Sequence, residues 1–164
     1  MPQRVTKTLV FLGFYSLLHF LYELVPVLPV ALIAGTNESV FTHMKLAFYA
    51  YLFTSIIFLN SDNNGTTPQV AAFTSSLVPL FLLAVWYLVP LFVGEIHPLG
   101  VELAYSFVVL AVNSFMVGSI EQQLKGAELQ RGLKYAAAFL FVCSIIFYTG
   151  FTFTSPFIDL FEIP

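Results

Sequence analysis

Two ionisable residues lie four positions apart in the first long apolar run of the chain, His19 and Glu23. A spacing of four places both side chains on one helix face, and Tyr15, one turn before His19, extends that face. A histidine beside a carboxylate in apolar surroundings can move a proton, hold a ligand or bind a metal. The alternative interpretation is a hydrogen-bonded pair that fixes helix packing.

A second polar face is predicted in the apolar run 99–120. Glu102, Ser106 and Asn113 fall on one side of a helix there, since eleven residues make close to three turns. Glu102 has a structural alternative, because the dipole of a helix favours a carboxylate in the first turn. Asn113 lies deeper, and we expect it to hydrogen-bond to a neighbouring helix.

We expect the two polar faces to meet in the outer half of a helix bundle. Antiparallel helices would bring Glu23 near Ser106 and His19 near Leu110. Other ionisable groups gather at the same rim, but they have no local ligand spacing, so we predict no metal and no other cofactor. These rim groups are His43, Lys45, Glu95 and His97.

The composition determines what must position these residues. The chain has 164 residues, 59% of them hydrophobic and 9% charged, and its mean hydropathy is +0.89. Such a chain cannot cover itself with a water-compatible surface, so its solvent must largely be lipid. We predict an all-α, polytopic transmembrane helix bundle that forms a single integral membrane domain over residues 1–164. Its five spans are expected at 9–31, 42–59, 70–94, 99–120 and 133–154.

The cations predict the orientation of the bundle. With five spans and the N-terminus inside, the inner side receives five of the six cations: Arg4, Lys7, Lys125, Arg131 and Lys134. Only Lys45 falls outside, as the positive-inside rule favours. Glu121 to Arg131 is expected to be a charged inner loop.

Small residues recur on the other side of the run 99–120. Because small side chains let helix backbones approach closely in lipid, we expect this helix to be the central one of the bundle. The small residues are Gly100, Ala104, Ala111, Ser114 and Gly118.

The sequence contains no phosphate loop, paired CxxC, HExxH or nucleophile elbow, and it assigns no catalytic residue. The leading interpretation is a non-catalytic subunit or assembly factor of a larger membrane complex. The alternatives are a small membrane enzyme or binding protein for a lipid-like substrate, or a proton-coupled carrier, each using the two polar faces. The expected partners are the lipid bilayer and other membrane-protein subunits. Nucleic acid is excluded, because the net charge is −3 and there is no basic run.

Overall fold

The computed structural model describes residues 3–59, 66–94, 98–125, 130–154 and 159–161. These residues form α1 (Gln3–Leu24), α2 (Leu28–Ile33), α3 (Val40–Phe58), α4 (Pro68–Val93), α5 (Leu99–Leu124), α6 (Arg131–Phe151) and the short 3₁₀-helix η1 (Asp159–Phe161). The five long helices have the length and apolar composition needed to cross a membrane. The predicted all-α bundle with five spans is therefore confirmed. Its orientation stays a prediction.

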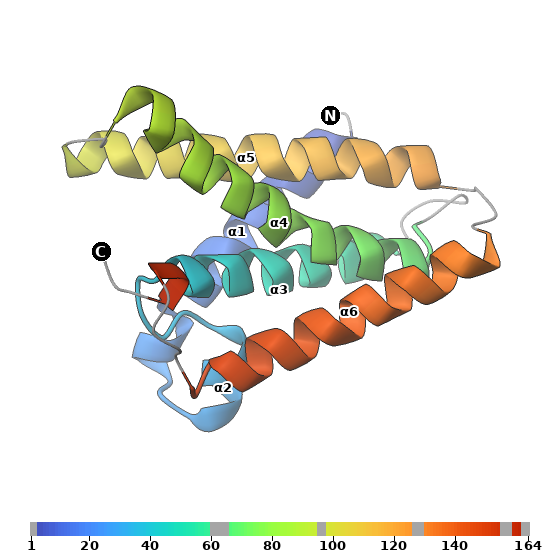
Figure 1. Cartoon of the computed structure of the whole chain (residues 1–164), viewed down its shortest axis with the longest axis horizontal. Coiled ribbons are helices and arrows are strands. Elements are labelled where there is room, and N and C mark those ends of the chain that lie inside the picture. The colour runs from blue at the N-terminus through green and yellow to red at the C-terminus, as the bar shows by residue number, and fades with distance from the viewer. Residues whose placement is uncertain (1–2, 60–65, 95–97, 126–129, 155–158, 162–164) are drawn as a thin grey trace.

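Helix α3 is the centre of the bundle, which corrects the expectation that α5 would be. Figure 1 shows α3 in the middle of the view, with α5 above it and α6 below it. Thirteen of the nineteen residues of α3 are buried, whereas α6 has two buried residues. The aromatic side chains Phe41 and Phe48 join α3 to Tyr148 of α6, with ring centroids 5.8 and 5.2 Å apart. Large apolar side chains therefore build the core around α3.

The small residues of α5 pack closely over only part of that helix. Ser114 and Gly118 are buried, and the Ser114 hydroxyl lies 3.3 Å from the Thr8 hydroxyl of α1. Gly100 and Ala104 are exposed. The expectation of a small-residue face packed along its length is thus wrong near the start of α5. There the small side chains of α5 are exposed and do not form a helix–helix contact surface among the described residues.

The limits of the first span differ from the prediction at both ends. Helix α1 begins at Gln3 and ends at Leu24, and residues 28–33 form the separate helix α2. Pro26 explains the break, because proline disfavours helical geometry in the residue before it and cannot donate a backbone hydrogen bond. Pro29 then sits in the first turn of α2, where proline is tolerated.

Helix α5 continues to Leu124, so Glu121 lies in its last turn instead of a loop. Glu121 is buried, and its carboxylate pairs with the equally buried Nζ of Lys7 on α1. It also accepts hydrogen bonds from Tyr51 Oη at 3.0 Å and Thr66 Oγ1 at 2.6 Å. Glu121 therefore belongs to a helix and not to the charged inner loop that the sequence predicted. Lys7 and Glu121 each satisfy the charge of the other inside the bundle.

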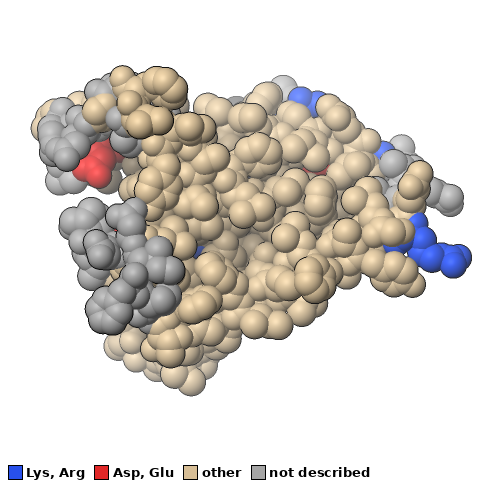
Figure 2. Space-filling view, in the orientation of Figure 1, with Lys and Arg blue, Asp and Glu red and all other residues tan. Residues whose placement is uncertain are grey.

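Lys45 is likewise buried and not at the rim. Its Nζ donates to the Ala31 carbonyl at 2.9 Å and to Thr152 Oγ1 at 3.3 Å. On the face in Figure 2, Lys and Arg side chains show mainly at the end where α6 begins, and the middle is almost free of charge. This distribution matches the cation asymmetry on which the predicted orientation depends.

Gly118→Leu should destabilise the bundle. A Cβ at Gly118 would meet Tyr51 Oη at 3.8 Å, which is ordinary contact, but a leucine side chain would reach the buried Tyr51–Glu121 pair. We expect a loss of about 1–3 kcal/mol in unfolding free energy, measured by thermal unfolding in detergent. Gly118→Ala should be close to wild type. Gly100→Leu is the matched control, since nothing lies within 4 Å of a Cβ there. Equal stability of both leucine variants would contradict the packing described.

The free energies of unfolding lost by the two single substitutions in the buried ion pair should add up to more than the loss in the double variant. Lys7→Met or Glu121→Gln alone leaves the partner's charge uncompensated, which typically costs about 3–5 kcal/mol. The double variant should lose much less than the sum, because no unpaired charge remains. Glu23→Gln, at an exposed residue, is the control. Additive losses in a double-mutant cycle of unfolding free energies would show that Lys7 and Glu121 do not stabilise each other.

Candidate functional site

A pocket of about 240 Å³ lies between α1, α3, α4 and α5, near the end of the bundle where α1 ends and α3 begins. Four of the six predicted site residues line it: Tyr15 and His19 of α1, with Glu102 and Ser106 of α5. Apolar side chains form most of the remaining wall: Phe20, Leu82, Leu103, Phe107, Val109 and Leu110. The pocket therefore combines a polar end with an apolar wall, as ligand sites commonly do.

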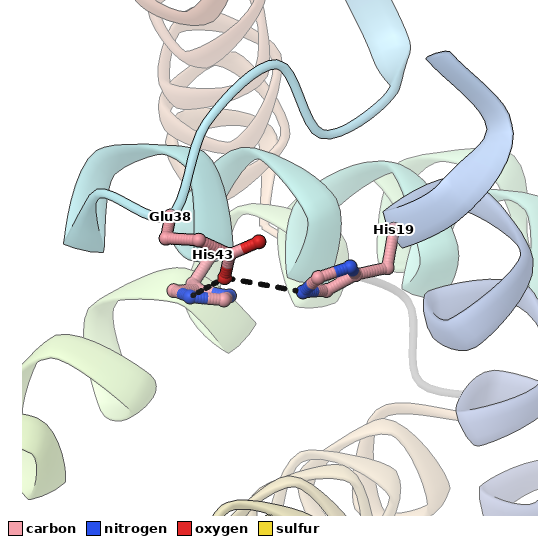
Figure 3. Close-up of side chains that lie close together, drawn as sticks. All are labelled: His19, Glu38 and His43. Carbon is pink, nitrogen blue, oxygen red and sulfur yellow. Dashed lines mark ion pairs between the residues drawn. The ribbon is translucent and has the colours of Figure 1, made fainter. Parts of the chain in front are cut away.

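Three ionisable side chains from three different segments meet at this pocket. Glu38 comes from the loop before α3 and lies between His19 of α1 and His43 of α3, as Figure 3 shows. Its Oε2 is 3.5 Å from the Nε2 of each histidine. Both histidines are partly buried, whereas the Glu38 side chain is 58% exposed. The cluster thus forms the polar end of the pocket, with the histidines on its inner side and Glu38 on its exposed side.

The loop that carries Glu38 is held by specific local contacts. The Gly35 N–H donates to the Leu18 carbonyl at 3.0 Å, and a Cβ on Gly35 would lie 2.9 Å from the His19 carbonyl oxygen. Only glycine permits so close an approach to the α1 backbone. Next to Glu38, Asn37 Oδ1 accepts hydrogen bonds from the backbone N–H and the hydroxyl of Ser39, the residue that caps α3. Glu38 is therefore positioned by the residues on both sides of it.

Further contacts orient His43. The hydroxyl of Tyr15 lies 2.8 Å from its Nδ1, and the Trp86 ring stacks on the imidazole with centroids 5.7 Å apart. This contact at Nδ1 leaves Nε2 directed at Glu38. Tyr15, which the sequence placed beside His19, thus acts mainly on the other histidine.

Two buried polar atoms of pocket residues lack hydrogen-bond partners within the described part of the chain. They are Nδ1 of His19 and Oη of Tyr105. Such atoms are rare in folded proteins, and each one costs roughly 1–3 kcal/mol when left unsatisfied. The same pocket therefore contains polar groups that an additional molecule could satisfy.

Two predicted site residues lie elsewhere. Glu23 is exposed and makes no hydrogen bond or ion pair with the described residues, so the expected approach to Ser106 is wrong. The carboxylate beside His19 is Glu38, which the loop brings into that position. Asn113 is buried outside the pocket and donates to the Val78 carbonyl of α4 at 2.9 Å, which confirms the predicted interhelical hydrogen bond.

Sequence reasoning missed Glu38 and did not assign His43 to a site, although a local signal was present. Ser39 is the N-cap of α3 and accepts from the Thr42 N–H. Glu38 and His43 then occupy the positions just before the cap and four residues after it, where hydrophobic side chains often pack against each other at helix starts. An exact start for α3 would have predicted their contact. Glu95 and His97, the other predicted rim groups, lie outside the described residues.

The donor set of the cluster suits several kinds of chemistry. One nitrogen from each histidine and one Glu38 oxygen lie within 4.8 Å of one another, close enough to share one metal ion. Two imidazoles and a carboxylate also suffice to exchange a proton with a bound molecule or to hydrogen-bond its polar head. The three residues come from three separate segments, which is why no local ligand spacing in the sequence indicated them.

The comparisons with known proteins identify the family of the chain. No curated protein and no solved structure matches it. A family model covers residues 4–163, which is nearly the whole chain. The chain therefore belongs to the family described as "family of unknown function (DUF6512)".

Proposed function

We propose that this protein is an integral membrane binding protein for a small amphiphilic molecule, which occupies the pocket between α1, α3, α4 and α5. The observation that carries this proposal is the pair of unsatisfied buried atoms in the pocket, His19 Nδ1 and Tyr105 Oη. A ligand with a polar head would provide partners for such atoms and remove their desolvation cost.

The apolar wall supports a ligand that is only partly polar. Phe20, Leu103 and Phe107 line the pocket and are also strongly exposed on the outer surface of the bundle. In a membrane these side chains would contact lipid tails, so an apolar chain could pass between them into the pocket. The polar head would then lie beside Glu38 and the two histidines.

The leading interpretation from the sequence, a non-catalytic subunit or assembly factor, stays a prediction. That interpretation was based on the absence of catalytic motifs from the sequence. A purely structural subunit would have no need for a pocket with unsatisfied polar groups. A proton-coupled carrier has less support. Phe11 is fully buried and packs between Tyr15 and Tyr51, with ring centroids 6.2 and 5.9 Å away. This apolar ring separates the histidine cluster from the buried Lys7–Glu121 pair.

Trp86 allows a direct test, because it lines the pocket and the chain has a single tryptophan. We expect decan-1-ol and decanoic acid, titrated into protein in phosphatidylcholine nanodiscs, to change Trp86 fluorescence in a saturable way. Ser106→Phe should fill the pocket and weaken this response at least about tenfold, equivalent to 1.4 kcal/mol. Helical circular dichroism and thermal unfolding would verify that the variant is folded.

Val108→Phe is the matched control, since Val108 lies on the same helix two residues further on and is 61% exposed. It should respond to both probes as the wild type does. A response that never saturates, or that is equal in Ser106→Phe and wild type, would indicate partition into the lipid and would contradict the proposal.

A further inference from the structure

We infer that His19, Glu38 and His43 form a binding site for one divalent transition-metal ion at the polar end of the pocket. The ligand atoms would be Nε2 of each histidine and Oε2 of Glu38. The three residues come from α1, the loop before α3, and α3 itself. Helix packing and a tightly held loop therefore both contribute to the site.

The distances between the ligand atoms suit a metal better than a set of hydrogen bonds. Glu38 Oε2 is 3.5 Å from each Nε2, at the limit for a hydrogen bond. A tetrahedral ion with bonds of about 2.0–2.2 Å holds its ligand atoms about 3.3–3.5 Å apart. One ring nitrogen of each histidine and one Glu38 oxygen all lie within 4.8 Å of one another. The two Glu38 distances already match the tetrahedral spacing, so an ion could be accommodated by small adjustments of the side chains.

The surroundings of His43 match those of a metal-ligating histidine. Such histidines usually hydrogen-bond through the ring nitrogen that does not bind the metal, which orients the ring. Tyr15 Oη occupies this position, 2.8 Å from His43 Nδ1. The Trp86 ring stacked on His43 further restricts its rotation. His43 is therefore held with Nε2 directed at the site.

Charge also favours a cation at this place. The pocket is lined by two carboxylates, Glu38 and Glu102, and by no Lys or Arg among the described residues. A dication would compensate this negative charge. The donor set selects its class, because two imidazoles and one carboxylate suit zinc or iron(II), whereas magnesium and calcium prefer oxygen ligands alone.

Three protein ligands leave a coordination position for another molecule, as in catalytic zinc sites. All three ligands line the pocket, so this position would be available to the head of a bound amphiphile. In this respect the inference rests on the proposed function. It also narrows the ligand class to amphiphiles whose head coordinates a metal, such as a carboxylate.

The test uses the full-length protein in detergent after chelator treatment, with Co²⁺ as the probe and Zn²⁺ as the competitor. We expect one Co²⁺ per chain, with the visible absorption of low-symmetry coordination, displaced by one equivalent of Zn²⁺. Glu38→Gln and His43→Gln should abolish this absorption. Tyr15→Phe should weaken binding about 10–100-fold, the usual effect of removing a partner of a metal ligand.

Glu23→Gln is the control, because Glu23 is a carboxylate on the same helix as His19 but is exposed and outside the pocket. It should bind Co²⁺ like the wild type. Absence of the absorption in folded wild type, or equal Co²⁺ binding by Glu38→Gln, would overturn the metal site. Fluorescence titration of the metal-free protein with decan-1-ol separates the proposal of an amphiphile pocket from the proposal of a metal site. If the Trp86 response is saturable but Co²⁺ does not bind, the ligand pocket is supported and only the metal site is contradicted.

Discussion

The bilayer offers no hydrogen-bond partner to a buried charge, and the architecture of this chain depends on that constraint. Three charged residues of the described chain are buried, Lys7, Lys45 and Glu121, and each has internal partners. The Lys7–Glu121 pair joins the start of α1 to the end of α5, two helices far apart in sequence. Lys45 joins α3 to the end of α2. Because an unpaired charge would be so costly, these contacts specify which helix ends must meet.

Helix α3 connects the two polar regions of the bundle. In its second half, Tyr51 donates to Glu121, and at its start His43 faces Glu38. Between them the helix is almost wholly buried, with Phe48 among its fully buried side chains. The resulting rigid apolar core holds both polar clusters at fixed depths. The histidine cluster is therefore positioned by the packing of the whole bundle, and only Glu38 depends on a loop.

The two polar regions differ in how completely they are satisfied. Around Glu121, hydroxyl groups and an ammonium group surround the carboxylate, as expected of a structural network. At the pocket, His19 and Tyr105 retain unsatisfied atoms, and Glu38 is mostly exposed. Natural proteins rarely keep such unsatisfied groups without a use for them. This contrast is why the pocket, and not the buried ion pair, supports a proposal of ligand and metal binding.

The sequence by itself determined that this is an all-helical chain with five helices long and apolar enough to span a membrane, because apolar runs of sufficient length have few alternatives in lipid. It also identified Tyr15, His19, Glu102 and Ser106, since helical periodicity shows which residues share a face. Periodicity carries no information about contacts between segments. Tertiary structure alone decided that the carboxylate beside His19 is Glu38 and not Glu23. It also decided that Lys7 is buried with Glu121 and that α3 is the central helix. The physical reason is that loops and helix packing bring together side chains that no local spacing relates.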